Sequence, residues 1–260
     1  MKTFQTIFSL LVVLLISTVA FSQPVDMAIS SPAKPTKFSL TVTQGVSVSN
    51  TANDLVKGME NSGLGDRTPD VYNPGFWFIF YFPGYTTRGE DYPKKKQTNA
   101  FYKFKARYDL TPKTAVAINW STSMNATVEG HDRFGQQSGN FLTLESKVKI
   151  LTVDYILRTG KGWSGLEAGP AIAFHTVDQT VSNNVNPYHH KGIKPGIHLG
   201  YNLSIIKSST WIVAANVQYN WFLKDKVGPI TIEDEITSVY KTQSVGLSNL
   251  GLGITAGFKF

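Results

Sequence analysis

The chain has 260 residues, of which 42% are hydrophobic and 12% aromatic, with a formal net charge of +7 and no cysteine. This length suffices for one large all-β domain, and the lack of cysteine excludes disulfides and a lipid-modified cysteine after an export signal. The basic charge alone would suit nucleic acid. No helix-turn-helix, zinc or aromatic RNA-binding pattern accompanies it, so we expect no nucleic-acid partner.

The first residues have the pattern of a secretory signal peptide, which is removed from the mature protein. An apolar run over residues 7–19 is followed by Ala-Phe-Ser and a cleavage point before Gln23. The run is short for a membrane span, which disfavours the alternative of an uncleaved N-terminal anchor. We therefore expect a signal peptide over residues 1–22. Residues 23–36 carry three prolines and no period, which predicts an extended periplasmic linker.

After the linker, eight segments alternate between apolar and small or polar residues with a period of two, the pattern of β-strands with one apolar face. In the last segment this alternation continues up to Phe260. A slip of phase between Ile150 and Leu151 predicts a β-bulge, and Pro170 predicts a bulge or a local bend. The predicted strands lie at about 37–48, 99–110, 114–123, 140–157, 163–176, 192–206, 211–222 and 250–260.

The connections between these segments alternate between long and short, as in barrels with short periplasmic turns and longer extracellular loops. Eight strands put both termini on the periplasmic side, as export requires. The first extracellular loop, about 49–98, is the longest and contains the aromatic run 76–82. We expect this run to pack on the barrel rim or to dip into the membrane surface, where aromatic residues are enriched. An additional spanning strand and an aromatic binding platform are the alternatives.

A soluble eight-stranded barrel of the lipocalin type would also alternate, but with its apolar face inside. An eight-stranded barrel has an interior just wide enough for side chains to fill. The Gly, Ala, Ser, Asn and Thr face of segments 163–176, 192–206 and 250–260 suits such a lumen, whereas the Ile, Leu, Phe and Trp face would overfill it. The sequence therefore predicts an all-β, eight-stranded antiparallel up-and-down transmembrane β-barrel over residues 37–260.

Glycine alternates with apolar residues in Glu167-Ala-Gly-Pro170, in Gly192-Ile-Lys-Pro-Gly-Ile-His-Leu-Gly-Tyr201 and in Gly251-Leu-Gly-Ile-Thr-Ala-Gly-Phe-Lys-Phe260. These stretches resemble the outer membrane protein β-barrel family, small porin-like proteins similar to OmpA/OmpX-type eight-stranded barrels. The resemblance implies the outer membrane of a Gram-negative bacterium, with outer-membrane lipid and lipopolysaccharide around the barrel. It also implies a C-terminal signal for the barrel-assembly machinery at Ile254, Phe258 and Phe260. The long first loop departs from the smallest members, and the family does not imply one activity.

A set of charged and histidine side chains lies on the strand faces that we expect to point into the lumen. A narrow interior leaves them little water, so they must pair. We interpret them as a salt-bridge network that plugs the barrel. The alternative is a narrow porin-like channel for small anionic solutes, lined by the excess of lysine. The predicted lumen residues are Lys103, Lys105, Arg107, Glu145, Lys147, Glu167, His175, Lys194 and His198.

The sequence contains no pattern typical of an enzyme, a metal centre or a cofactor site. No serine lies in a Gly-x-Ser-x-Gly elbow, and the sequence places none beside His175 and His198. His189 and His190 are interpreted as loop residues, because they lack the helical spacing and the further ligands of a metal site. Motifs for phosphate, dinucleotide or calcium are absent. We therefore expect no catalysis and no cofactor, and interpret the protein as a structural anchor that presents extracellular loops to an envelope protein or ligand.

Overall fold

The computed structural model describes residues 38–65, 71–73, 76–77, 81–82, 85–87, 91–131, 141–159, 163–181, 187–208, 210–232 and 238–260. The predicted signal peptide and periplasmic linker lie outside these ranges. Among the residues that the structure describes, no helix has the length and apolar character needed to cross a membrane.

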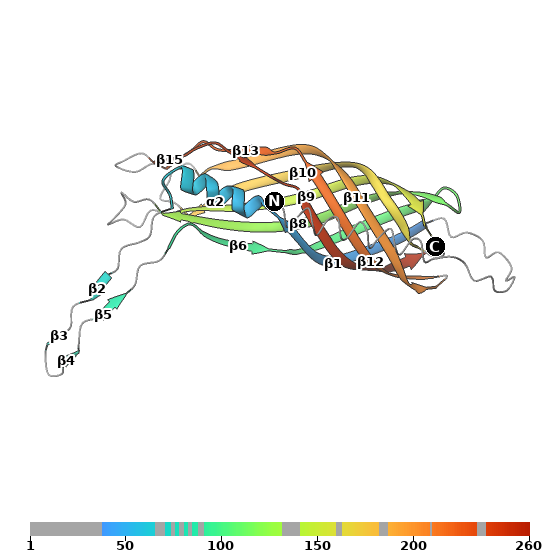
Figure 1. Cartoon of the computed structure of the whole chain (residues 1–260), viewed down its shortest axis with the longest axis horizontal. Coiled ribbons are helices and arrows are strands. Elements are labelled where there is room, and N and C mark those ends of the chain that lie inside the picture. Colours follow the sequence, from blue (N-terminus) through green and yellow to red (C-terminus); the bar gives the residue numbers. More distant parts are fainter. Residues whose placement is uncertain are drawn as a thin grey trace, which may run out of the picture.

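Eight strands close into a barrel, which confirms the predicted fold class (Figure 1). Each of them pairs antiparallel with the next barrel strand along the chain, and β1 pairs with β17 to close the sheet. Closure removes the free edges that an open sheet would expose to lipid. The barrel strands are β1 (Phe38–Ser49), β7 (Ala100–Asp109), β8 (Thr114–His131), β9 (Phe141–Arg158), β10 (Gly165–Val181), β11 (His189–Lys207), β12 (Trp211–Phe222) and β17 (Asn249–Lys259).

The barrel strands fall into two lengths. β1, β7, β12 and β17 have 10–12 residues, which is the length of a tilted membrane span. β8 to β11 have 17–19 residues, and their extra residues raise one side of the barrel by up to about 20 Å at the end opposite Phe38 and Phe260, which the sequence predicts to be extracellular. We call this side the tall wall. The loop predicted at 124–139 is therefore wrong over its first residues, because β8 continues to His131 and its upper part pairs with β6 (Lys94–Thr98).

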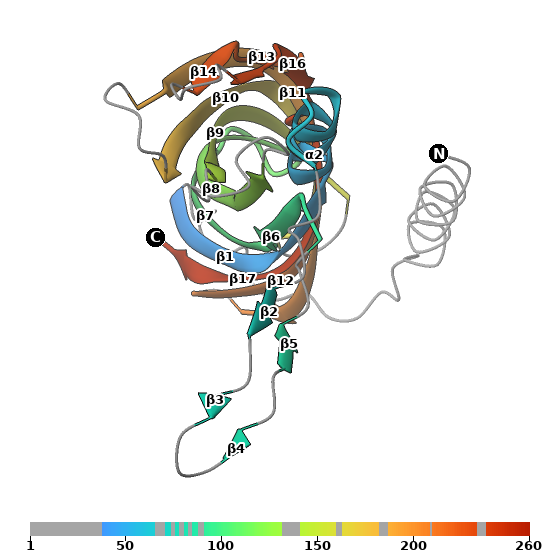
Figure 2. The ribbon, with the colours of Figure 1, turned by 90° about the vertical axis from the view of Figure 1, so that its left-hand side faces the viewer.

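A folded cover packs on the inner face of the tall wall (Figure 2). Its first part is α2 (Thr51–Asn61), which the sequence analysis did not predict and which contacts β6, β8 and β16. Its second part is the connection between β12 and β17, which forms a hairpin. We call α2 and this hairpin the cover. The hairpin pairs β13 (Asp225–Val227) with β16 (Gln243–Val245) and β14 (Ile230–Ile232) with β15 (Ser238–Tyr240).

Between α2 and β6 the chain forms a second hairpin, which projects away from the barrel (Figure 1, Figure 2). We call residues 71–87 the arm. The described residues of the aromatic run lie at the far end of the arm and not on the barrel rim, whereas contact of the run with the membrane surface stays a prediction. The arm pairs β2 (Val71–Asn73) with β5 (Tyr85–Thr87) and β3 (Phe76–Trp77) with β4 (Tyr81–Phe82).

The phase slip between Ile150 and Leu151 is not a bulge. β9 pairs with β8 and β10 through these residues without a register shift. Ile150 points inward and Leu151 outward, because the apolar face of the strand changes from the inner side above this level to the outer side below it. Pro170 does not cause a bulge either: the pairing of β10 with β9 lapses at Gly169 and Pro170 and resumes in the same register.

Candidate functional site

The membrane-spanning part of the barrel presents apolar side chains outward and polar side chains inward. On β1, the outer face exposes aliphatic residues while the inner face buries serine and threonine. Aromatic pairs lie at both levels of the apolar band. The Trp211 and Phe258 ring centroids are 4.2 Å apart near the periplasmic end, and those of Trp120 and Phe174 are 5.8 Å apart near the extracellular end. These are the surface features of a transmembrane β-barrel.

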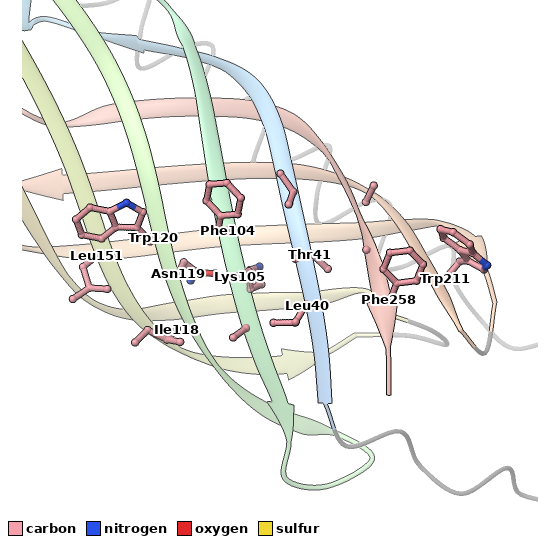
Figure 3. A pocket seen from close by; sticks show the side chains of 14 residues that line it. Leu40, Thr41, Phe104, Lys105, Ile118, Asn119, Trp120, Leu151, Trp211 and Phe258 are labelled. Atoms are coloured by element: carbon pink, nitrogen blue, oxygen red, sulfur yellow. The ribbon is translucent and has the colours of Figure 1, made fainter.

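A groove of about 720 Å³ crosses this outer surface over β8, β7, β1 and β17 (Figure 3). Ala106 and Ala256 line it between the larger side chains of Phe104, Trp120 and Phe258. The difference in side-chain size creates the hollow. Because these side chains face the membrane, the groove belongs to the lipid-facing surface and suits lipid acyl chains.

The centre of the lumen contains a buried ion pair between Lys105 of β7 and Glu167 of β10. Asn202 of β11 also donates a hydrogen bond to Glu167. Next to this pair, the ammonium of Lys103 donates to Oε1 of Gln218 at 2.7 Å. Lys103, Lys105 and Glu167 are each at most 2% exposed. Protein side chains therefore satisfy these charges in place of water.

A second polar group adjoins the ion pair. His198 Nδ1 lies 2.7 Å from Oδ1 of Asn220, and its Nε2 lies 3.7 Å from both Asp154 Oδ2 and Glu167 Oε2. Asn119 donates to the Asp154 carboxylate. Asp154 was not among the predicted lumen residues. Its signal was present in the sequence, because Asp154 alternates with the outward Val153 and Tyr155.

Trp163 lies at the periplasmic end of the lumen. A tryptophan near a strand end of a membrane barrel is commonly interfacial, but this indole is buried inside the barrel. Its Nε1 donates to Ser39 Oγ at 3.3 Å, and its ring lies 4.9 Å from the Lys105 ammonium and 5.1 Å from the Arg107 guanidinium. Arg107 is also paired with Asp109 at 2.9 Å. Cation–π contacts of this kind stabilise cations that have lost water.

Two predicted lumen residues, Glu145 and Lys147, lie outside the lumen. They are on the extracellular part of β9, pair with each other at 3.4 Å and have side chains that are 38% and 47% exposed. The prediction failed because the inner face of the tall wall is apolar at this level. His175 and Lys194 do point inward, but they lie above the lumen network, beside Asp225. The residues that lie in the lumen as predicted are Lys103, Lys105, Arg107, Glu167 and His198.

Above the membrane level the interior of the barrel is an apolar core. Leu144 and Ile150 of β9 belong to the same buried cluster as Leu55 of α2 and Tyr240 of β15. The helix approaches Tyr240 closely because residue 58 is glycine: a Cβ at Gly58 would lie 2.2 Å from the Tyr240 hydroxyl. Burial raises the pKa of Tyr240, so its phenol is neutral. The cover and the tall wall therefore form one packed unit.

One polar cluster is embedded in this core. Oδ2 of Asp225 lies 2.8 Å from His175 Nδ1 and 2.8 Å from His190 Nε2, and Oδ1 lies 3.0 Å from the Lys194 ammonium. Burial alone would raise the pKa of Asp225, but these hydrogen bonds outweigh it and hold the pKa below its usual range. Ser146 Oγ lies 2.9 Å from His175 Nε2, which gives the order Ser–His–Asp. Ser146 is only 1% exposed, so a substrate does not reach its hydroxyl in this arrangement.

The predicted assembly signal lies on the outer face of β17. Ile254, Phe258 and Phe260 are exposed on the lipid side of the barrel. The backbone N–H of Phe260 donates to the carbonyl of Phe38 at 2.8 Å, next to the seam where β17 pairs with β1. These residues are therefore placed at barrel closure, and their recognition by assembly machinery stays a prediction.

The sequence matches no protein-family model and no curated protein. Among solved structures it is similar to the crystal structure of the outer membrane protein OprG from Pseudomonas aeruginosa, with 12% identity, a TM-score of 0.43, and coverage of 86% of this chain and 97% of OprG. The outer membrane protein AlkL, solved by solid-state NMR in DMPC lipid bilayers, gives 12% identity and a TM-score of 0.38, with coverage of 91% of this chain and 98% of AlkL. Identity this low transfers no activity.

Proposed function

We propose that this protein is an outer-membrane anchor with a closed lumen, which holds its cover and arm at the cell surface for an envelope protein or another ligand. The observation that carries the proposal is the burial of the lumen charges. Charges that line a conducting pore stay hydrated, because removing their water costs several kcal/mol per ion. Here the lumen charges are each at most 2% exposed: Lys103, Lys105, Arg107, Glu167 and His198.

The lumen is filled at three successive levels. Trp163 fills the periplasmic end, the pair of Lys105 with Glu167 fills the middle, and the apolar core with α2 fills the extracellular end. The cations are also held by protein acceptors, which does not favour an anion channel. Lys105 pairs with Glu167, Arg107 and Arg158 both pair with Asp109, and Lys103 donates to Gln218.

Lysines on the outer surface support an orientation with the tall wall outside the cell. On β9 the outer face changes from Leu151 to Lys149 one pleat above it, and on β11 it changes from Ile193 to Lys191. An apolar band bordered by lysine matches the level at which hydrocarbon gives way to anionic headgroups. The phosphates of lipopolysaccharide supply such anions, so we propose this lipid as the direct neighbour of the tall wall.

The two parts of the cover, α2 and the hairpin, are tied to each other in a way that suits a rigid platform. Near the start of α2, the Thr51 hydroxyl donates to the Gly246 carbonyl at 2.9 Å, and Asp54 Oδ2 accepts from the Gly246 N–H at 2.8 Å. The arm follows α2 in the chain, and its described strands extend away from the membrane-spanning strands (Figure 1). Preorganised support of this kind lowers the cost of ordering a binding surface.

Conductance across a planar bilayer tests the closed lumen. The chain is refolded, and a heat-dependent shift on a gel verifies that the barrel has closed. We expect no current steps. Steady, salt-dependent current steps that favour anions would contradict the anchor proposal and would support the alternative function, a narrow channel for small anionic solutes.

The accessibility of the arm in intact cells tests the anchor role. Trypsin added outside the cells should cut beside the arm at Arg88, while the paired strands of the barrel stay protected. A chain that lacks residues 71–87 serves as the control and should still show the heat-dependent gel shift. Protection of the arm until the outer membrane is permeabilised would show that it faces the periplasm, which contradicts the proposal.

A further inference from the structure

The cluster around Asp225 brings together side chains from three separate elements near the extracellular end. His175 lies on β10, His190 on β11 and Asp225 on β13. Their nitrogen and oxygen ligand atoms all lie within 4.8 Å of one another. Two imidazoles and one carboxylate form a mixed N/O donor set, which suits Zn²⁺ and neighbouring transition metals better than Mg²⁺ or Ca²⁺.

The strand pairing makes room for this arrangement at one position. His175 lies directly opposite Gly192 in the β10–β11 ladder, and His190 lies two residues before Gly192 on the same inner face. A Cβ at Gly192 would lie 2.0 Å from Asp225 Oδ2. Only glycine at position 192 leaves room for the Asp225 carboxylate beside the two imidazoles.

Groups around the cluster orient the donors as metal sites require. Ligand histidines normally use their second ring nitrogen in a hydrogen bond that fixes the ring. His175 Nε2 has such a partner in Ser146 Oγ at 2.9 Å, while its Nδ1 faces Asp225. The ring of His190 stacks on that of Tyr188 with an interplanar angle of 1°. On Asp225, Oδ1 accepts from the Lys226 N–H at 2.9 Å, and Oδ2 faces both histidines.

We propose that His175, His190 and Asp225 form a binding site for one divalent transition-metal ion of the Zn²⁺ class. The ion takes the place of the protons that the imidazoles share with Oδ2 of Asp225. Zn²⁺ holds such ligands at about 2.0–2.2 Å, so the donors need to move only slightly from their present contacts. The ion fastens β13 of the cover to β10 and β11 of the tall wall. This site is independent of whether the arm binds a partner.

Substitution of Lys194 allows a second test, in which metal binding should change in the opposite direction. Its ammonium lies 3.0 Å from Oδ1 of Asp225, so its positive charge opposes a cation at Oδ2. Removing the charge should therefore tighten metal binding, whereas removing a ligand should weaken it. Both His190, at 20% side-chain exposure, and Lys194, at 28%, are accessible enough for substitutions that leave the barrel closed.

Zn²⁺ titration of the refolded, chelator-treated full chain by calorimetry tests the site, with Co²⁺ absorption as a second readout. We expect one ion per wild-type chain, at least about tenfold weaker binding in His190→Ala, and tighter binding in Lys194→Gln. His189→Ala is the matched control, because His189 is an adjacent exposed histidine paired with Asp178 away from the cluster. The heat-dependent gel shift verifies that each variant is folded.

Three results would overturn the proposal. The first is a wild-type chain that binds no Zn²⁺. The second is a His190→Ala chain with wild-type affinity, or a His189→Ala chain that loses as much affinity as His190→Ala. The third is a Lys194→Gln chain that binds Zn²⁺ no tighter than the wild type, which would remove the ion from the vicinity of Asp225.

Discussion

The lower and upper parts of β9 lie in different surroundings. The apolar face of the strand points outward in the lower part and inward in the upper part. Within the membrane its inner face carries Asp154 and its outer face Val153, whereas above the membrane its inner face carries Ile150 and its outer face Lys149. The backbone pairing continues unbroken through the change. The polarity of a strand face therefore follows what covers it: lipid outside and a hydrogen-bonded lumen inside in one part, water outside and the cover inside in the other.

The largest effect should come from removing one partner of the central ion pair. Glu167→Gln leaves the Lys105 ammonium buried without its carboxylate, which should cost about 3–5 kcal/mol of unfolding free energy. Urea unfolding in lipid vesicles, followed by the heat-dependent gel shift, measures it. Glu145→Gln is the matched control, because Glu145 lies on the outer face above the membrane and its loss should change stability by less than about 0.5 kcal/mol.

A paired replacement guards against a variant that simply does not fold. Lys105→Met combined with Glu167→Leu removes both charges, and such exchanges are often neutral. The double variant should recover most of the stability that Glu167→Gln loses. Equal losses in the single and the double variant would mean that shape, and not charge pairing, determines the stability of the lumen.

The next effect concerns the outer face of β9. Val153→Arg puts a charge against lipid and should cost about 2–4 kcal/mol, less if the site is near the interface. Lys149→Val, four residues away on the same face, should change the unfolding free energy by less than about 0.5 kcal/mol. The same vesicle unfolding assay compares the two. If Val153→Arg were as mild as Lys149→Val, the boundary between lipid and water would lie lower than Leu151.

The Asp225 cluster should give a pH-dependent effect. Asp225→Asn weakens charge-assisted hydrogen bonds and should destabilise the protein by about 1.5–3 kcal/mol at neutral pH. Because the native pKa of Asp225 is lowered, its contribution is complete above the ordinary pKa of about 3.9 and is lost only as the pH falls below it. The stability difference between wild type and variant, measured by urea unfolding from pH 7 downward, should shrink below about pH 4. A difference that disappears already near neutral pH would contradict the lowered pKa.

The smallest effect should come from the contact between α2 and the cover hairpin. Gly58→Ala usually stabilises a helix by about 1 kcal/mol, but here the new Cβ meets the Tyr240 hydroxyl. The clash should reverse the sign and give a net loss of about 1–2 kcal/mol. Proteolysis of the cover at increasing temperature measures it. Lys57→Ala, on the exposed side of the same helix, should be neutral; a stabilised Gly58→Ala chain would show that Tyr240 moves aside freely.

The strands were predictable because their signal is local. Residues alternate with a period of two because the two faces of a strand meet different surroundings. This alternation identified eight strands and the inward positions of Lys105, Glu167 and His198. The slip at Ile150 was also visible, but two causes produce the same pattern. An extra residue in a bulge and an inversion of inside and outside both move apolar residues by one position, and only the pairing with β8 and β10 distinguishes them.

The cover was harder to predict because its signals are weak or long-range. In α2, Ala52, Leu55 and Met59 recur at helical spacing. This signal covers only 11 residues and lies within a long polar segment, so the segment was interpreted as a loop. The histidine and lysine partners of Asp225 lie far from it in sequence. Its contact with His175 spans 50 residues, and it forms only because the chain after β12 folds back over the tall wall.

The sequence by itself determined a transmembrane barrel of eight antiparallel strands, because each strand records the polarity of its two faces in its own residues. Only the tertiary structure decided where the membrane ends along β9, that Trp163 fills the lumen from below, and that Asp225 meets two histidines. These features depend on what lies opposite a residue in space. A closed barrel with unequal strands brings such residues together from distant parts of the chain, and no local pattern encodes that.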